Sequence, residues 1–324
     1  MMLCTKRSNC FLLILVAIDF YIKNRVMKIN SVINEKGGKV VRTSKYTPVF
    51  VIGQILKWTF LIIMVTFTLY PVAYAILGSF KTNFELTLGG SILPENFNFN
   101  NYTQAFVKGN FGLYTKNSVI VATVVTILAL MTSSMAGYVF ARREFKGKKF
   151  IYSMYTAFLF ISIGAVTLYP IYALFNMIGL TKNLFGMALV MTGGQASNVF
   201  LITGFVKSIP RELDEAAIID GCSPFQVFYM IIIPMIRPIL AVVMLFSFRS
   251  AWNNYIIPQV MTIGNAKLRT LTVAVVQLKY SANAAAEWNI MLAGAAIALV
   301  PILIIYSFTH KQFISGLTSG AVKG

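Results

Sequence analysis

Four of the chain's ten acidic residues gather in one short stretch between two long apolar runs: Glu212, Asp214, Glu215 and Asp220. The helix dipole stabilises carboxylates near a helix start, so the first three predict that a short helix begins here. Ser208 and Pro210 precede them as a capping residue and an early-turn proline.

The spacing within the stretch predicts the faces of this helix. Leu213, Ala216 and Ala217 lie at helical spacing and would form a small, flat apolar face that lets another protein approach closely. Gly221 can adopt the left-handed conformation that ends a helix. Ser223, Pro224 and Gln226 form the pattern of a capping box with an early proline. A second helix is therefore expected to begin directly after Gly221 and to lead into the next apolar run. An ordinary pair of interfacial helices would show the same local signals.

Other chemistry is absent from the sequence. Gly37, Gly38 and Lys39 lack the spacing of a phosphate-binding loop, so we expect no ATP site in this chain. The single histidine, His310, has no partner for a metal site, and the three cysteines do not have metal-ligand spacing: Cys4, Cys10 and Cys222. We therefore expect no catalytic residue, metal site or cofactor in this chain.

The composition places the chain among membrane proteins. Of its 324 residues 57% are apolar and 12% are charged, and the mean hydropathy is +0.72, which excludes an ordinary soluble domain. A helix needs roughly 20 apolar residues to cross a bilayer. Six segments reach this length, and Arg249 alone interrupts them with a charge: residues 58–80, 117–140, 150–181, 183–206, 238–266 and 288–309. We predict an all-α membrane protein with six transmembrane helices, whose acidic stretch lies in the loop 207–230 between spans four and five.

The net charge of +18 could indicate nucleic-acid binding, but its distribution favours the membrane. With the N-terminus in the cytoplasm, nineteen Lys and Arg residues fall on the cytoplasmic side and seven on the opposite side. This bias predicts that both termini are cytoplasmic, and it leaves no need for a nucleic-acid partner. Residues 1–57 would be a basic, largely disordered extension, in which the status of residues 1–26 stays open. Residues 58–310 would be the membrane domain, and residues 311–324 a cytoplasmic tail.

The acidic stretch resembles the EAA loop of ABC-importer permeases. The match consists of Glu215-Ala216-Ala217, then Gly221, and an isoleucine run that ends at Pro234. The maltose-permease branch is also similar at Gly137-Tyr138-Val139-Phe140-Ala141-Arg142 and in the glycine-rich end at residues 313–324. The chain departs from the family pattern at Cys222, where alanine is commoner, and at Ile233, where leucine is commoner.

The resemblance implies a type I permease fold in the bacterial plasma (inner) membrane, crossing it several times in contact with lipid. It implies import of a sugar or oligosaccharide together with a second permease subunit, a dimer of ATPase subunits that bind ATP and Mg, and an extracytoplasmic solute-binding protein. The binding protein would meet the outward loops, residues 81–116 and 267–287. The ATPase would contact the residues of the EAA stretch: Leu213, Glu215, Ala216, Ala217, Asp220, Gly221 and Pro234.

Polar residues at membrane depth have two interpretations. They could line a path for the solute, or they could hold helices together, as small and amide side chains do in membranes. The candidates are Gln195, Asn198, Arg249, Trp252, Asn253 and Asn254. For Arg249 three readings stay open: an acidic partner in the other permease subunit, carbonyl groups or water inside the bundle, or an anionic or hydroxyl-rich solute.

Two other transport functions compete with sugar import. A permease for an anionic or other small solute, of the glycerol phosphate type, would also explain Arg249. A secondary transporter would need acidic residues inside the spans or matched broken helices, and the sequence shows neither.

Overall fold

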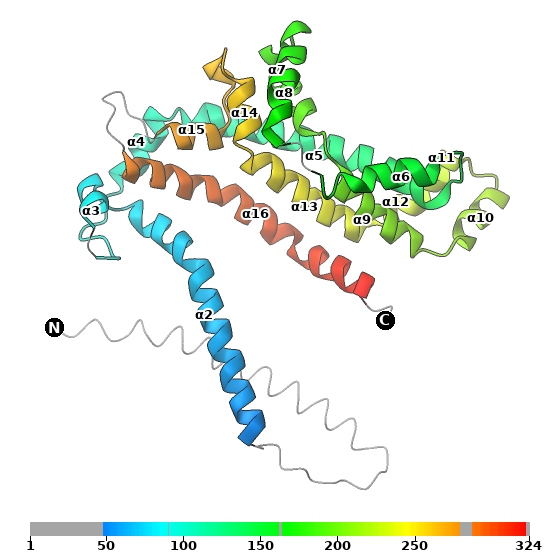
Figure 1. Cartoon of the computed structure of the whole chain (residues 1–324), viewed down its shortest axis with the longest axis horizontal. Helices are drawn as coiled ribbons and strands as arrows, with labels where there is room; N and C mark the ends of the chain where they lie inside the picture. The colour runs from blue at the N-terminus through cyan, green and yellow to red at the C-terminus, as the bar shows by residue number, and fades with distance from the viewer. Residues whose placement is uncertain (1–47, 90, 162–163, 279–286, 322–324) are drawn as a thin grey trace. The chain divides into compact units, whose positions relative to one another are not determined.

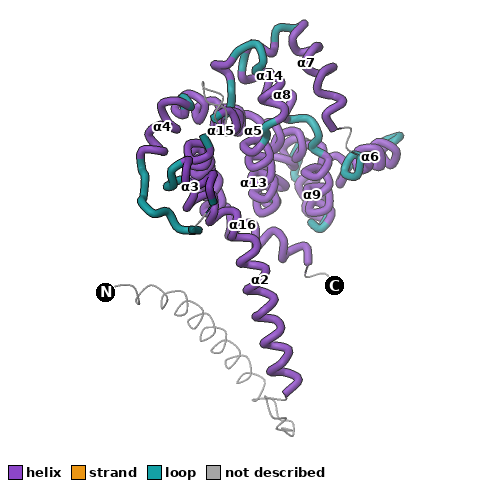
Figure 2. The backbone as a smooth tube through the Cα atoms, turned by 60° about the vertical axis from the view of Figure 1, so that its left-hand side comes forward, coloured by secondary structure: helices purple, strands orange, loops and turns teal. Residues whose placement is uncertain are grey.

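The computed structural model describes residues 48–89, 91–161, 164–278 and 287–321. Within these ranges the chain forms helices, turns and loops and no strand (Figure 2), which confirms the all-α class. The chain divides into two compact units, residues 1–66 and residues 67–324. Helix α2 (Pro48–Gly78) begins in the first unit and ends in the second. Most of the expected N-terminal extension, residues 1–47, lies outside the described residues.

Three helices are each long and apolar enough to cross a membrane. They are α2 over Ile52–Gly78, α5 (Phe111–Arg142) and the Trp288–Phe308 part of α16 (Trp288–Ala321). Two bent pairs reach the same length together: α8 (Leu184–Met191) with α9 (Ala196–Lys207), and the Pro224–Met235 segment with α13 (Arg237–Asn253). By length and composition the described residues thus support three to five spans, where the sequence predicted six.

Shorter elements connect these helices in unit 2 (Figure 1). They are α3 (Asn83–Leu88), α4 (Asn100–Lys108), α6 (Lys148–Ala157), η1 (Gly164–Thr167), α7 (Leu168–Met177), η2 (Leu180–Lys182), α10 (Glu212–Ile219), α11 (Pro224–Gln226), η3 (Val227–Ile232), α12 (Ile233–Met235), α14 (Ile256–Met261), η4 (Ala266–Leu268) and α15 (Leu271–Gln277). Of these, η3 has π-helical hydrogen bonding and the other η elements are 3₁₀-helices.

Three expected spans are interrupted, and glycines with positive φ lie at two of the breaks. The third, residues 150–181, is divided among α6, η1 and α7, and Gly164 at its break has a positive φ of 61° that no α-helix accommodates. The fourth bends by 59° between α8 and α9, where Gly194 has a φ of 73°. The fifth, residues 238–266, is interrupted between α13 and α14, and the chain also bends by 80° just before α13, next to Pro234 and Pro238, which cannot donate helix hydrogen bonds.

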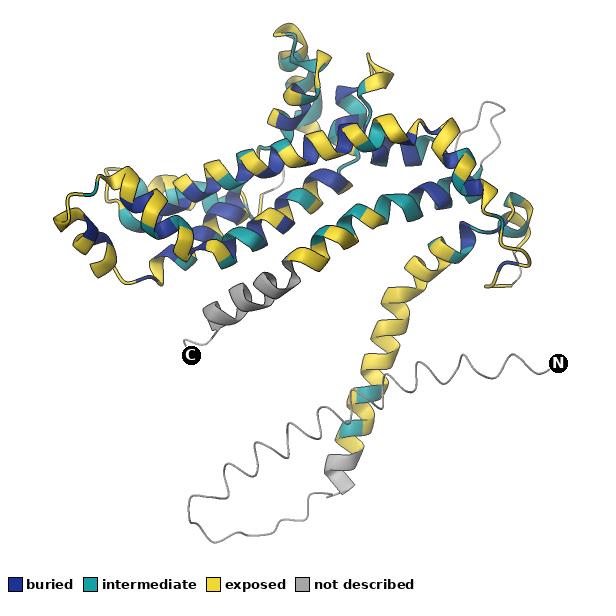
Figure 3. Cartoon of the chain, turned by 180° about the vertical axis from the view of Figure 1, so that it is seen from behind, coloured by how far each residue is buried: buried dark blue, intermediate teal, exposed yellow. Residues whose placement is uncertain are grey.

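The core of unit 2 consists of two clusters along the same helices. Helix α5 packs against α9 and α13, and α13 packs against α16 (Figure 1). One cluster lies around the start of α5, with Phe111, Trp252 and Leu271. The other lies around its end, with Tyr138, Ile202 and Phe228. Buried residues alternate with exposed apolar ones along these helices (Figure 3), as expected for helices whose outer sides contact lipid or another membrane subunit.

Candidate functional site

Helix α10 (Glu212–Ile219) forms where the acidic stretch predicted a helix, with Glu212, Asp214 and Glu215 in its first turn. The expected cap is wrong. The Oγ of Ser208 donates to the carbonyl of Phe205, 2.7 Å away, and so belongs to the end of α9. The residue at the N-cap position of α10 is Arg211, whose side chain makes no capping hydrogen bond. The dipole and the three carboxylates therefore stabilise this helix start without a side-chain cap.

The faces of α10 differ from the expected apolar face. Two residues one turn apart, Asp214 and Ala217, are buried against the chain itself, with 9% and 6% of their surfaces exposed. Ala217 packs in the cluster of Ile202 and Phe228, where another protein does not reach it. Leu213 and Ala216 remain exposed, as do Glu215, Ile218, Ile219 and Asp220. The surface open to a partner thus keeps two of the three expected apolar residues and lacks Ala217.

The end of α10 confirms the prediction for Gly221, whose φ is 86°. The amide of Cys222 donates to the carbonyl of Ala217 at 2.9 Å, and the amide of Gly221 donates to that of Ile218 at 3.0 Å. These two bonds are the Schellman pattern, which satisfies the last carbonyls of a helix. A β-carbon at Gly221 would have no atom within 4 Å, so only the backbone conformation requires glycine.

The second helix begins with the predicted capping box. The Oγ of Ser223 accepts a bond from the amide of Gln226 at 3.3 Å, and Oε1 of Gln226 accepts one from the amide of Ser223 at 2.6 Å. Pro224 occupies the first helical turn. The segment then continues as the π-helical η3 and the short α12, which contains Pro234, before the bend into α13. Pro234 therefore lies directly before a sharp bend, ahead of the expected fifth span of residues 238–266.

An ion pair between α10 and α5 was not predicted from the sequence. Nε of Arg142, the last residue of α5, lies 2.7 Å from Oδ2 of Asp214, and both side chains are nearly buried, with 5% and 12% exposed. Nη2 of Arg142 also donates to the carbonyl of Ile209 at 3.0 Å. The sequence carried a signal, since Arg142 ends the Gly137–Arg142 motif, but its contact with Asp214 depends on the tertiary fold.

The residues at membrane depth separate into two groups. Nδ2 of Asn198 donates to Oγ of Ser247 at 3.1 Å and to Oε1 of Gln195, and Nε1 of Trp252 donates to the carbonyl of Ala298 at 3.1 Å. These contacts join α9 to α13 and α13 to α16, which is the helix-packing interpretation. In contrast, Arg249 and Asn253 are exposed one turn apart on α13, and Asn254 accepts a bond from the amide of Ile257 at 3.1 Å.

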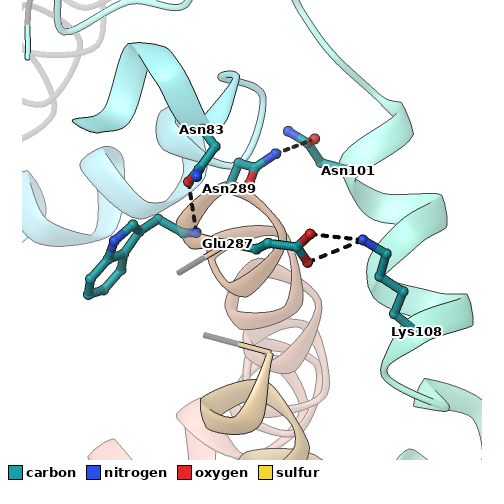
Figure 4. Close-up of polar contacts among 6 residues, drawn as sticks. Asn83, Asn101, Lys108, Glu287 and Asn289 are labelled. Carbon is teal, nitrogen blue, oxygen red and sulfur yellow. Dashed lines mark hydrogen bonds and ion pairs between the residues drawn. The ribbon is translucent and has the colours of Figure 1, made fainter. Parts of the chain in front are cut away.

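The two expected outward loops are joined by a polar network (Figure 4). Asn101, which is 1% exposed, accepts a bond from Nδ2 of Asn289 at 2.9 Å. Its own Nδ2 donates to the carbonyls of Ser79 and Lys81, each at 2.8 Å. Lys108 pairs with Glu287 at 3.0 Å, and the amide of Trp288 donates to Asn83 at 3.0 Å. The start of α16 is thereby held against α3 and α4.

Residues 129–317, more than half of the chain, match the model of a family described as binding-protein-dependent transport system inner membrane component. The chain belongs to this family. The matched region contains α10, the glycine turn and the bend at Pro234. This membership places the chain in the inner membrane as a subunit of a transport system.

Two curated relatives cover most of this inner membrane component. The probable ABC transporter permease protein YurM of Bacillus subtilis (strain 168) is 30% identical, with 84% of this chain and 90% of the relative covered. The arabinooligosaccharides transport system permease protein AraQ of the same organism is 29% identical, with 86% and 99% covered. Among solved structures, one chain of a bacterial ABC transporter involved in the import of the acidic polysaccharide alginate has the same fold. The TM-score is 0.71 at 20% identity, and the match covers 84% of this chain and 100% of that chain.

Proposed function

We propose that this permease imports a sugar or oligosaccharide by coupling to a separate ATPase through α10. The observation that carries the proposal is the exposed face of α10, with Leu213, Glu215 and Ala216 on a helix whose other side is fixed to the chain's own core. A short, rigid helix with small residues on its outer face suits insertion into a groove of another protein. The name of the relative AraQ supports an oligosaccharide as the solute.

The mechanism follows from what each partner would contribute. The partner ATPase subunits would hold ATP and Mg, and their closure would displace α10. Movement of α10 would rock the membrane helices between inward-open and outward-open arrangements, as rigid elements do about an interface. A second permease subunit would complete the path, and a solute-binding protein would dock on the outward loops joined by the Asn101 network. Both termini would lie in the cytoplasm, in keeping with the charge distribution.

A second candidate solute is an anionic one. Arg249 is exposed on α13, and it takes part in none of the salt bridges found in the described ranges. A charged side chain at membrane depth faces an aqueous path or a partner. Uptake assays with neutral and carboxylated oligosaccharides would separate the two candidates, because Arg249→Gln should weaken uptake of an anionic solute alone.

The docking proposal is tested by adding bulk to the exposed face of α10. Ala216→Trp should leave the chain in the membrane with its partner permease and release the ATPase during detergent purification. Overpacking a tight contact costs about 1–3 kcal/mol, which corresponds to roughly 5- to 150-fold in affinity. Lys149→Trp, at an exposed position of α6, is the control for added bulk and should retain the ATPase.

The neighbouring alanine supplies a second comparison. Ala217→Trp places the same bulk in the chain's own core, so it should lower the amount of folded chain instead of selectively releasing the ATPase. An Ala216→Trp complex that keeps a full complement of ATPase and transports normally would show that α10 is not the docking element.

A further inference from the structure

The ion pair between Arg142 and Asp214 lies where α10 meets the end of α5, a helix of 32 residues. Arg142 is the last residue of α5, which runs from Phe111 through both core clusters. Asp214 is one of the two buried residues of α10, and the other, Ala217, offers a single methyl group to the core. The contact between α10 and the end of α5 is therefore electrostatic, while Ala217 packs α10 against η3.

Arg142 also fixes the connection that leads to α10. Its Nη2 donates to the carbonyl of Ile209 at 3.0 Å, while its Nε lies 2.7 Å from Oδ2 of Asp214 in a charge contact without a hydrogen bond. One guanidinium group thus holds the end of α5, the segment before α10 and α10 itself. The rigid guanidinium plane places charge beside Asp214 and a donor at Ile209 together, which a lysine ammonium group on a flexible stem would not reproduce.

Net stability gives little reason for a buried charge pair at this point. Removing two charges from water offsets most of their attraction, and well-packed apolar residues often serve folding equally well. In addition, Nε of Arg142 and Oδ1 of Asp214 are both buried, and neither has a hydrogen-bond partner within the described part of the chain. Separating two buried opposite charges is costly, so the pair opposes independent movement of α10 and the end of α5.

We propose that Arg142 and Asp214 are positioning residues that transmit displacement of α10 into helix α5, and that the number of solute molecules moved per ATP hydrolysed depends on this pair. The inference rests on the proposed coupling function of α10. It differs from docking, because neither residue is on the exposed face that the ATPase would contact. Loss of the pair should therefore leave the ATPase bound and hydrolysing while transport fails to follow.

The test uses the assembled complex in proteoliposomes, with ATP hydrolysis and solute uptake measured on the same preparation. Asp214→Asn keeps the side-chain shape and removes the charge, so the ATPase should copurify in normal amount. Uptake per ATP should fall at least about fivefold, the lower end of typical coupling between sites. Asp214→Glu retains the charge and should restore part of the ratio. Glu212→Gln removes an exposed carboxylate from the same helix turn and should leave uptake per ATP unchanged.

A wild-type ratio of uptake to hydrolysis in Asp214→Asn would overturn the inference and make the pair a structural contact. If Asp214→Asn does not assemble, the double variant Arg142→Met with Asp214→Leu decides, because it fills the site without charge. An assembled double variant with a normal ratio overturns the inference, and one with a lowered ratio supports it. Failure of the docking proposal looks different, since Ala216→Trp would then retain the ATPase and transport normally.

Discussion

Replacing Gly221 by valine should abolish transport while leaving the membrane helices inserted. Gly221 has a φ of 86°, and the Schellman hydrogen bonds at the end of α10 depend on that conformation. An added β-carbon would meet no atom within 4 Å, so crowding does not contribute to the expected effect. The perturbation therefore acts on the backbone conformation alone.

The magnitude follows from the cost of a left-handed residue. For an ordinary residue this cost is about 1–2 kcal/mol, and it is larger for a β-branched residue. A loss of this size lowers the ratio of native to non-native turn by a factor of roughly 5–30. The order of effects should be valine worst, then alanine, then asparagine, because asparagine tolerates the left-handed region best. In each variant the residues of α10 are unchanged, but the helix should lose its fixed orientation relative to the segment that follows it.

The assay measures solute uptake and ATPase copurification at equal membrane abundance for the series of Gly221 variants. Gly204→Val is the matched control, because Gly204 lies in α9 without a positive φ and also has no atom within 4 Å of an added β-carbon. This control should transport nearly normally. Wild-type uptake in Gly221→Val would refute the reasoning, since it would mean that the turn forms without the left-handed conformation.

Two further predictions concern packing and orientation. A β-carbon at Gly137 would lie 2.6 Å from Cγ2 of Ile202, so Gly137→Ala should destabilise the α5–α9 contact by about 1–3 kcal/mol. The loss is measured as a lower melting temperature of the purified complex. Gly112→Ala is the control and should not lower it, because an added β-carbon there meets no atom within 4 Å. In a variant whose native cysteines are serines, Asn96→Cys should react with an impermeant thiol reagent in intact cells, whereas Lys146→Cys should react only after permeabilisation. The reverse labelling pattern would invert the orientation and place α10 on the wrong side for an ATPase.

The sequence predicted the local features of the site well. The Gly221 turn and the capping box of Ser223 and Gln226 each depend on residues at most a few positions apart, so their signals are complete in a short window. The cap at Ser208 was predicted wrongly because a serine between two helices can serve either one, and in this chain it bonds to the end of α9.

Features that depend on the tertiary fold could not be predicted in this way. Helical spacing placed Ala217 beside Ala216 and Leu213, but spacing alone does not say which side of α10 packs on the chain's own core. The pairing of Arg142 with Asp214 joins distant parts of the chain. The number of spans could not be predicted in this way either. Hydropathy gives the length of an apolar segment, but it does not detect a break in the helix such as that at Gly194.

The hydrogen bonds of the polar residues at membrane depth indicate which of them are available to a solute. Asn198 and Trp252 use their side-chain N–H groups within the chain, so a solute would have to compete with existing helix contacts to bind them. Arg249 and Asn253 lie one turn apart on the exposed side of α13 and share one helix face. Any contact of this subunit with solute, or with an acidic group of a second permease, is therefore expected along that face. Because a desolvated arginine without a counter-charge is costly, whatever covers this face must supply an acceptor or water.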